Sequence, residues 1–327
     1  RSNLSVESQA MAHRVIFEGS RAVGVEYKQR GKLKVARVGR EILLCAGAYN
    51  TPQLLQVSGV GPGNHLRSLG IEVVADRAGV GANLQDHFNA PLMYRLNQDF
   101  TVNDLVNNWT HKIRHGLKYF FQRRGFMGMS VAYAGGFLKV HPNTSTPDIQ
   151  NLLMMFSSEF IGDPVDPFPG CSLVVALMRP ESRGSVKISS SDPSIPPVID
   201  GNYLASPKDR ETMVLALKRC RQIMEQTALQ RFIVEEIRPS VDCQTDEDFE
   251  GYLESHGRTS YHPVGTCRMG DDDEAIVDPR LRVNGLRGLR VVDASIMPSL
   301  VSGNTNGPTI MIGEKASDMI LEDAASS

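Results

Sequence analysis

The chain has 327 residues, with 35 Lys and Arg against 37 Asp and Glu, so its formal net charge is −2 at pH 7. Hydrophobic residues make up 41% and charged residues 22% of the sequence, which is typical of soluble globular proteins and excludes disordered and fibrous classes. The small net charge argues against a surface for nucleic acid or for an anionic membrane, since both require clustered positive charge. No apolar run approaches the roughly 20 residues that span a bilayer.

The length suits two domains, or one large domain with an insertion. The five cysteines are irregularly spaced and include no CxxC pair. They indicate neither a disulfide framework nor a zinc ribbon, and they favour a reducing, cytoplasmic location. The chain opens at Arg1 without an initiator Met or a signal sequence, which is typical of a start inside a domain.

The first 60 residues predict a hairpin, a strand and a helix. The hairpin comprises β-type runs at 15–17 and 22–27, with turn-forming residues between them. The apolar run at 42–48 predicts a strand buried on both faces, as in a parallel sheet. Pro52 then predicts the first position of a short helix over 53–57. A strand, a turn and a helix N-terminus in this order direct backbone N–H groups at an anion.

From about residue 86 the pattern changes to mixed strands and helices. Strands are predicted at 131–139, 149–156, 172–179 and 184–190, and helices at 103–122, 208–226 and 246–256. Because these elements do not alternate regularly, they predict an α+β arrangement with a largely antiparallel sheet. After residue 269 the chain returns to a strand at 289–293, a loop at 303–308 and an apolar-faced helix at 309–321.

Residues 261–270 contain the first candidate for chemistry. His262 precedes a proline, so it lies in extended or turn backbone. Its imidazole suits the role of general base near neutral pH, whereas the plainer alternative is a loop histidine bonded to a backbone carbonyl. His262 and Cys267 have no further His or Cys at a suitable spacing, so no metal site is predicted.

Residues 302–309 contain the second candidate. Asn304, Asn306 and two glycines stand directly before a helix. They suit a well-capped turn, or a site that sets an amide and backbone N–H groups against a substrate or ring system. A serine hydrolase using His262 and Asp293 is disfavoured, since the nearest nucleophile-elbow segment, 128–132, lacks its last glycine.

Together, six ordered segments resemble the glucose-methanol-choline (GMC) family of flavin-dependent alcohol oxidoreductases. The likeness is greatest to bacterial choline-dehydrogenase-like and aryl-alcohol-oxidase-like members. Residues 47–61 match the second signature of the family, and the remaining matches are 80–87, 180–204, 262–270, 291–298 and 304–315.

The resemblance implies an α/β plus α+β fold, in which a partial, Rossmann-like FAD-binding domain carries an inserted substrate domain. The FAD-binding domain would comprise residues 1–90 and 270–327. The substrate domain would comprise residues 91–269, with a mainly antiparallel sheet backed by helices.

The same resemblance implies roles for individual residues. His262 would take the hydroxyl proton, or hold the alkoxide, as a hydride leaves the carbinol carbon for flavin N5. An amide cannot act as a base, so Asn306 would orient the hydroxyl. The implied contacts to FAD are Ala12 at the adenine, Asp293 and Ala294 along the phosphate–ribityl region, and Gly307, Pro308 and Thr309 beside the isoalloxazine.

Family members begin with a glycine-rich βαβ unit that receives the FAD pyrophosphate, and the resemblance starts downstream of that unit. We therefore expect a C-terminal piece of a longer protein, which by itself neither holds FAD nor turns over. The implied partners are a small-molecule alcohol, oxygen or a quinone as electron acceptor, and the missing N-terminal half or a second copy, but no nucleic acid. The alternative is an inactive fragment or interaction module.

Overall fold

The computed structural model describes residues 1–130, 132–159 and 162–325, which divide into two compact units. Unit 1 contains residues 1–86, 182–203 and those from 261 onward, and unit 2 contains residues 87–181 and 204–260. These units assign 182–203 and 261–269 to unit 1, whereas the predicted domain boundaries assign them to the inserted domain. That unit 1 binds FAD and unit 2 binds substrate remains a prediction.

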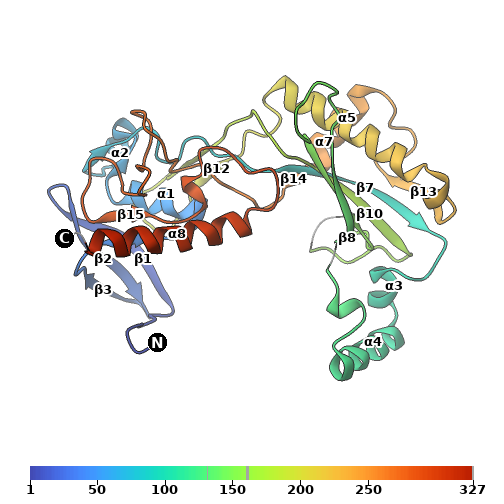
Figure 1. Cartoon of the computed structure of the whole chain (residues 1–327), viewed down its shortest axis with the longest axis horizontal. Coiled ribbons are helices and arrows are strands. Elements are labelled where there is room, and N and C mark those ends of the chain that lie inside the picture. Colours follow the sequence, from blue (N-terminus) through green and yellow to red (C-terminus); the bar gives the residue numbers. More distant parts are fainter. Residues whose placement is uncertain (131, 160–161, 326–327) are drawn as a thin grey trace. The chain divides into compact units, whose positions relative to one another are not determined.

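The predicted N-terminal hairpin is confirmed and gains a third strand. Strands β1 (Ala10–Glu18) and β2 (Arg21–Gln29) pair antiparallel, with Val15 opposite Val25 (Figure 1). Strand β3 (Lys32–Arg37) adds to β2. All six residues of β3 are exposed, so the sequence carries no buried face that would have predicted it.

The apolar run at 42–48 forms a parallel pair in unit 1, as predicted, but the strand is shorter, and the predicted burial on both faces is wrong because Leu43 is 43% exposed. Strand β4 (Ile42–Leu44) pairs with β15 (Leu289–Val291). The chain then turns at Gly47, whose φ of +83° favours glycine, and enters helix α1 (Gly47–Val57). A second short parallel pair consists of β5 (Val60–Gly61) and β6 (Ala75–Asp76). Helix α2 (Gly63–Ser68) lies between them in the sequence.

The prediction that Pro52 begins a helix is wrong, because α1 starts five residues earlier and Pro52 lies inside it. A helical residue at this position normally donates its N–H to the carbonyl of Ala48, and proline has no N–H to donate. The fully buried hydroxyl of Thr266 donates to that carbonyl instead, at 2.6 Å, from 218 residues further along the chain. A tertiary hydrogen bond thus replaces the one that the proline removes.

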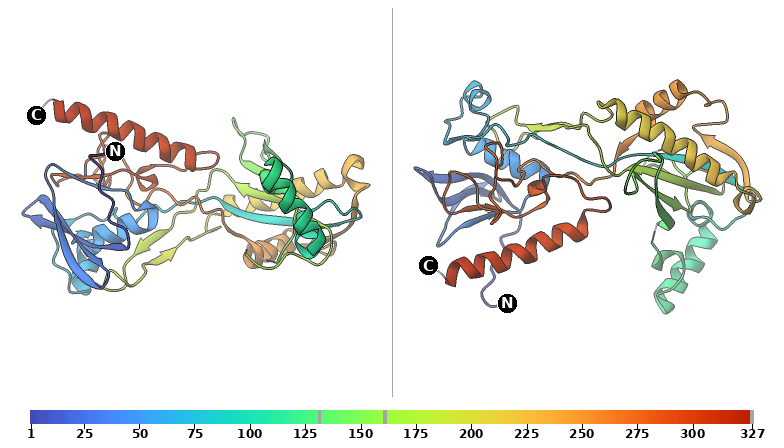
Figure 2. Two further views of the ribbon diagram at one scale, coloured as in Figure 1. Left: turned by 90° about the horizontal axis from the view of Figure 1, so that it is seen from below. Right: turned by 45° about the horizontal axis from the view of Figure 1, so that its top comes forward.

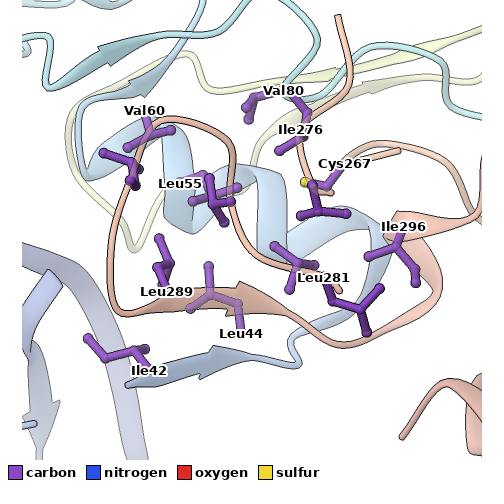
Figure 3. Packing of buried hydrophobic residues seen from close by; sticks show 14 of the residues in the cluster. Ile42, Leu44, Leu55, Val60, Val80, Cys267, Ile276, Leu281, Leu289 and Ile296 are labelled. Atoms are coloured by element: carbon purple, nitrogen blue, oxygen red, sulfur yellow. The ribbon is translucent and has the colours of Figure 1, made fainter. Parts of the chain in front are cut away.

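Apolar side chains from several segments form the core of unit 1 (Figure 3). Leu44 and Leu289 come from the parallel pair, Leu55 from α1, and Ile276 from the segment that precedes β15. Helix α8 (Asn306–Ala325) adds Ile312 and Ala316, and it begins three residues before the predicted helix.

A buried ion pair network fastens the end of α8 to this core. The Arg290 side chain in β15 is only 4% exposed and donates to Glu41 at 2.7 Å and to Asp323 at 2.5 Å. The carboxylate of Asp323 also pairs with the guanidinium groups of Arg282 and Arg280. Together, Arg290, Arg282 and Arg280 hold the pKa of this carboxyl well below its usual range. The segment that precedes β4 and the last turn of α8 are therefore joined through one arginine.

Unit 2 is built on the predicted antiparallel sheet, with strand order β13-β7-β10-β9-β8 and with β14 paired to β7. The bounds are β7 Phe88–Leu96, β8 Ala132–Leu138, β9 Ile149–Met154, β10 Gly170–Leu177, β13 Ile233–Arg238 and β14 Arg258–Thr259. Residue 131, at the start of one predicted strand, lies outside the described residues. The predicted strand at 184–190 is instead β11 (Ser185–Lys187), which pairs with β12 (Val198–Asp200) in unit 1.

Helices α5 (Pro207–Met224) and α7 (Asp246–His256) pack against the sheet of unit 2, as Figures 1 and 2 show. They bury Met213 and Leu217 from α5, and Phe249 from α7. The predicted helix at 103–122 is two helices, α3 (Val102–Asn107) and α4 (Trp109–Gln122). Asn108 separates them, because its side chain accepts the N–H of Thr110 and starts α4 anew.

Three shorter helices complete the described elements: α6 (Thr227–Gln230) and the 3₁₀ turns η1 (Phe126–Gly128) and η2 (Ala294–Ile296). Across the described residues, no helix is both long enough and apolar enough to cross a membrane.

Thr266→Val should lower the free energy of unfolding by about 1–2 kcal/mol, because the carbonyl of Ala48 loses its donor at constant side-chain volume. In a Pro52→Ala background the same substitution should cost less, since residue 52 then has an N–H for that carbonyl. Urea unfolding of the four chains of this cycle measures the difference. Equal costs of Thr266→Val in both backgrounds would contradict the assigned role.

Candidate functional site

The loop that carries His262 is fixed on both sides by backbone hydrogen bonds within unit 1. Val264 exchanges N–H to carbonyl bonds with Gln85 in both directions, at 2.9 and 3.1 Å. Three residues later, the N–H of Cys267 donates to the carbonyl of Ser295 at 2.9 Å. The loop is therefore held between the segment before Asp86 and η2, which limits how far His262 can move.

The carboxylate of Asp86 forms a second attachment for His262. Asp86 is only 3% exposed, and its Oδ1 accepts the backbone N–H of His262 at 2.9 Å. Its Oδ2 accepts the hydroxyl of Tyr203, also at 2.9 Å. One buried carboxylate thus connects three segments of the chain at the histidine. Asp86 lies in the segment 80–87 that resembles the family, but no local pattern in the sequence predicts that its carboxylate holds His262.

Burial and charge act in opposite directions on the imidazole of His262. The half-buried position lowers the pKa of His262 below its ordinary value, because burial penalises the charged form. The negative charge of Asp86 raises this pKa and offsets part of the effect. The ring is therefore neutral at pH 7 and can accept a proton.

An asparagine adjoins the imidazole, but it is Asn304. Its Nδ2 lies 3.4 Å from Nε2 of His262, close enough for a weak hydrogen bond when Nε2 carries no proton. Asn306, which the family resemblance pairs with the histidine, is the exposed first residue of α8. Its role as orienting residue stays a prediction.

The side chain of Asp293 is engaged by donors of the protein itself. It is 5% exposed and accepts from the N–H of Gly47 at 2.9 Å, the hydroxyl of Thr51 at 2.6 Å and the N–H of Ser295 at 2.8 Å. These bonds tie the start of α1 to η2. Contact between Asp293 or the half-buried Ala294 and a cofactor remains a prediction, and the carboxylate has a structural role in any case.

The first turn of α8 leaves room for a flat ring system, which the predicted flavin contact requires. Gly307 is exposed, and a Cβ built on it would meet no heavy atom within 4 Å, so a group can approach its backbone closely. Pro308 and Thr309 are half-buried, and the turn contains no acidic residue that would oppose an electron-rich ring edge. Ala12, the remaining predicted contact, is exposed in β1.

The residues that the structure describes offer little support for a metal site or a reactive thiol. It contains no cluster of three or more His, Cys, Asp or Glu arranged to hold a metal ion. All five cysteines are free, and burial raises the pKa of the Cys267 thiol well above its ordinary value. Cys267 beside the histidine loop is therefore a packing residue.

Protein-family models identify both ends of the chain. Two models described as GMC oxidoreductase match residues 1–89 and 180–313, and together they cover more than half of the chain. An "Oxygen-dependent choline dehydrogenase" of Chromohalobacter salexigens is 40% identical over 320 residues, which is 98% of this chain and 57% of the relative. A protein of the same name from Burkholderia ambifaria is also 40% identical and is covered to 56%. The chain thus spans little more than half the length of these relatives.

Solved structures show the same likeness. Formate oxidase of Aspergillus oryzae RIB40 is 25% identical with a TM-score of 0.91, covering 97% of this chain and 60% of that one. Pyridoxine 4-oxidase of Mesorbium loti is 27% identical with a TM-score of 0.81, covering 94% of this chain and 56% of that one. The mixed fold with a largely antiparallel sheet is confirmed.

Asp86→Asn should lower the pKa of His262 further, because it removes the negative charge and leaves the burial. Ring proton shifts of His262, followed by NMR against pH and assigned with His262→Gln, measure this change. Asp318→Asn, on the exposed side of α8, is the control and should leave the titration unchanged. An unaltered or raised midpoint in Asp86→Asn would contradict the electrostatic assignment.

The same titration has a consequence for stability. A folded-state pKa below the ordinary 6.5 means that the folded chain prefers neutral His262. Its contribution to stability is therefore present above about pH 6.5 and is lost as the pH falls through the folded-state pKa.

Asp293→Ala should lower the free energy of unfolding by about 3 kcal/mol, since three donors lose a charged acceptor at once. Thr51→Val removes one of these bonds together with the bond that its hydroxyl accepts from the N–H of Ala46 at 3.1 Å, and it should cost about 1–2 kcal/mol. Both values come from urea unfolding. If both variants lowered the free energy of unfolding by a similar, small amount, the carboxylate of Asp293 would not hold α1 to η2.

Proposed function

Since the chain belongs to the GMC oxidoreductase family, we propose that it supplies the acid–base group for FAD-dependent oxidation of an alcohol. The observation that carries this proposal is the neutral, half-buried His262, held at its backbone by Asp86 and flanked by the amide of Asn304. Such a ring accepts a proton without first having to lose one.

FAD, the cofactor of this family, supplies the acceptor for the hydride when it is bound. The residues that would hold it are Ala12, Asp293 and Ala294 together with the first turn of α8 at Gly307, Pro308 and Thr309. Because the Asp293 carboxylate already accepts three hydrogen bonds, its contribution is assigned to the backbone.

The chemistry of the chain itself is a single proton transfer. His262 accepts the hydroxyl proton of the alcohol at Nε2, while the carbinol carbon loses a hydride, so that an aldehyde or ketone forms. Asn306 orients the hydroxyl by hydrogen bonding, and an amide leaves His262 as the only acid–base group of the pair. The Nδ2 of Asn304 lies 3.4 Å from Nε2, so this weak hydrogen bond gives way to the hydroxyl when the alcohol binds.

The names of the relatives favour particular partners. Two choline dehydrogenases described as oxygen-dependent support a small alcohol as substrate and oxygen as the acceptor, with a quinone as the alternative acceptor. A cytoplasmic location is proposed on the free cysteines alone.

A second candidate function is a catalytically inactive fragment or interaction module. It is favoured by the absence of a GxGxxG sequence from these 327 residues, since that motif binds the pyrophosphate of FAD in dinucleotide-binding folds.

Desalting after incubation with excess FAD tests whether this chain holds the cofactor by itself. We expect the 327-residue chain alone to lose its visible flavin bands, which would mean that the proposed activity requires a further part that supplies the pyrophosphate site. In the flavin-loaded protein, His262→Ala should lower the rate of flavin reduction by alcohol roughly 10²–10⁴-fold, the range for a lost general base. Asn306→Ala should slow reduction while the flavin stays bound. Unchanged reduction rates in both variants would contradict the assignment.

A further inference from the structure

Helix α4 of unit 2 presents an apolar face to the surroundings. At about 100° per residue, five large side chains fall on one side of this 14-residue helix: Trp109, Ile113, Leu117, Phe120 and Phe121. Each is between 51% and 75% exposed, and no residue of α4 is buried. A surface helix of a globular protein normally turns such a face toward the core.

The contacts of α4 with its own unit are made by the opposite face. The ring of His115 lies 5.3 Å from that of Phe126 in η1, and Phe126 in turn lies 6.4 Å from Tyr133 in β8. Figure 1 shows α4 projecting beyond the sheet of unit 2. The helix is thus attached by its polar side, and none of the residues of unit 2 that the structure describes buries its apolar side.

The charge of this region is strongly one-sided. Residues 105–147 contain no Asp or Glu, but they contain six Lys or Arg. By helical position, Arg114 borders the apolar face next to Phe121, and Lys112 borders it on the other side. The expectation drawn from the net charge of −2 overlooks this asymmetry, because the acidic residues lie elsewhere in the chain.

These two features together identify the kind of partner. A protein partner would need an acidic rim to match this basic one, and its binding would not depend on lipid. Single-stranded bases stack on aromatic rings between basic residues, but the aliphatic Ile113 and Leu117 on the same face offer no such platform. A bilayer with anionic head groups accepts both, because acyl chains take the apolar face and phosphates take the cations.

We propose that α4 binds in the plane of an anionic lipid bilayer, with the face from Trp109 to Phe121 embedded below the head groups. At about 1.5 Å per residue the helix is too short to cross the bilayer, so it lies along the surface. Lys112, Arg114 and Lys118 then meet the phosphate layer, and binding weakens as salt screens these charges.

Trp109 reports on this face directly, because it is the only tryptophan of the chain. Vesicles containing about one-third phosphatidylglycerol should shift its emission to shorter wavelength, and brominated acyl chains should quench it. Vesicles of phosphatidylcholine alone should produce much smaller changes. Raising the salt concentration should reverse the shift.

Two sets of variants separate the apolar and electrostatic contributions. Phe120→Ser with Phe121→Ser should lower co-sedimentation of the full chain with anionic vesicles by about tenfold or more. Lys112→Glu with Arg114→Glu should lower it similarly while leaving the apolar face intact. The matched control is Val234→Ser with Val241→Ser, two exposed apolar residues elsewhere in unit 2, and should bind like the parent chain.

Several results would overturn the proposal. An emission spectrum unchanged by anionic vesicles would do so, as would equal binding to neutral and anionic vesicles. A blue shift that depends on protein concentration without lipid would assign the face to a second copy of the chain. Tryptophan emission already typical of a buried indole in dilute, lipid-free protein would mean that the face is covered by the chain itself.

Discussion

Unit 1 depends on how the first turns of α1 satisfy their polar groups. Pro52 leaves the carbonyl of Ala48 without its helical donor, and the hydroxyl of Thr266 supplies the substitute. Asp293 receives donors from the same end of the helix, at Gly47 and Thr51. Both partners lie between His262 and Asn304 in the sequence. The loop that carries His262 is thereby attached to a helix more than 200 residues earlier.

The chemistry expected of His262 rests on a balance between burial and one charge. Burial alone would push its pKa down until the ring became a weak base, and Asp86 limits that fall. The same carboxylate fixes the histidine backbone and the hydroxyl of Tyr203. The position and the basicity of the imidazole are therefore both set by the carboxylate of Asp86. This carboxylate bonds to the backbone of His262 and leaves Nε2 of the ring directed at Asn304.

Sequence reasoning succeeded where the signal was local and failed where it was tertiary. The hairpin over β1 and β2, strands β8, β9 and β10, and helices α5 and α7 follow from the local pattern. Strand β7, which pairs with three other strands of this sheet, is not among the predicted strands. The start of α1 does not follow from the local pattern, because the donor that replaces the N–H missing at Pro52 is the hydroxyl of Thr266, far along the chain. The proximity of Asn304 to the imidazole was also out of reach, since two asparagines stand two residues apart and only the backbone path between them decides which one faces His262.

The pairing of Arg290 with Asp323 ties the last turn of α8 to the interior of unit 1. Asp323 lies within the last five residues of the chain, yet it shares with Glu41 the neutralisation of a guanidinium that is almost fully withdrawn from water. Replacing Asp323 by a neutral residue would leave this guanidinium poorly compensated beside the parallel pair. The integrity of the core around β15 therefore depends on a residue in the last turn of α8.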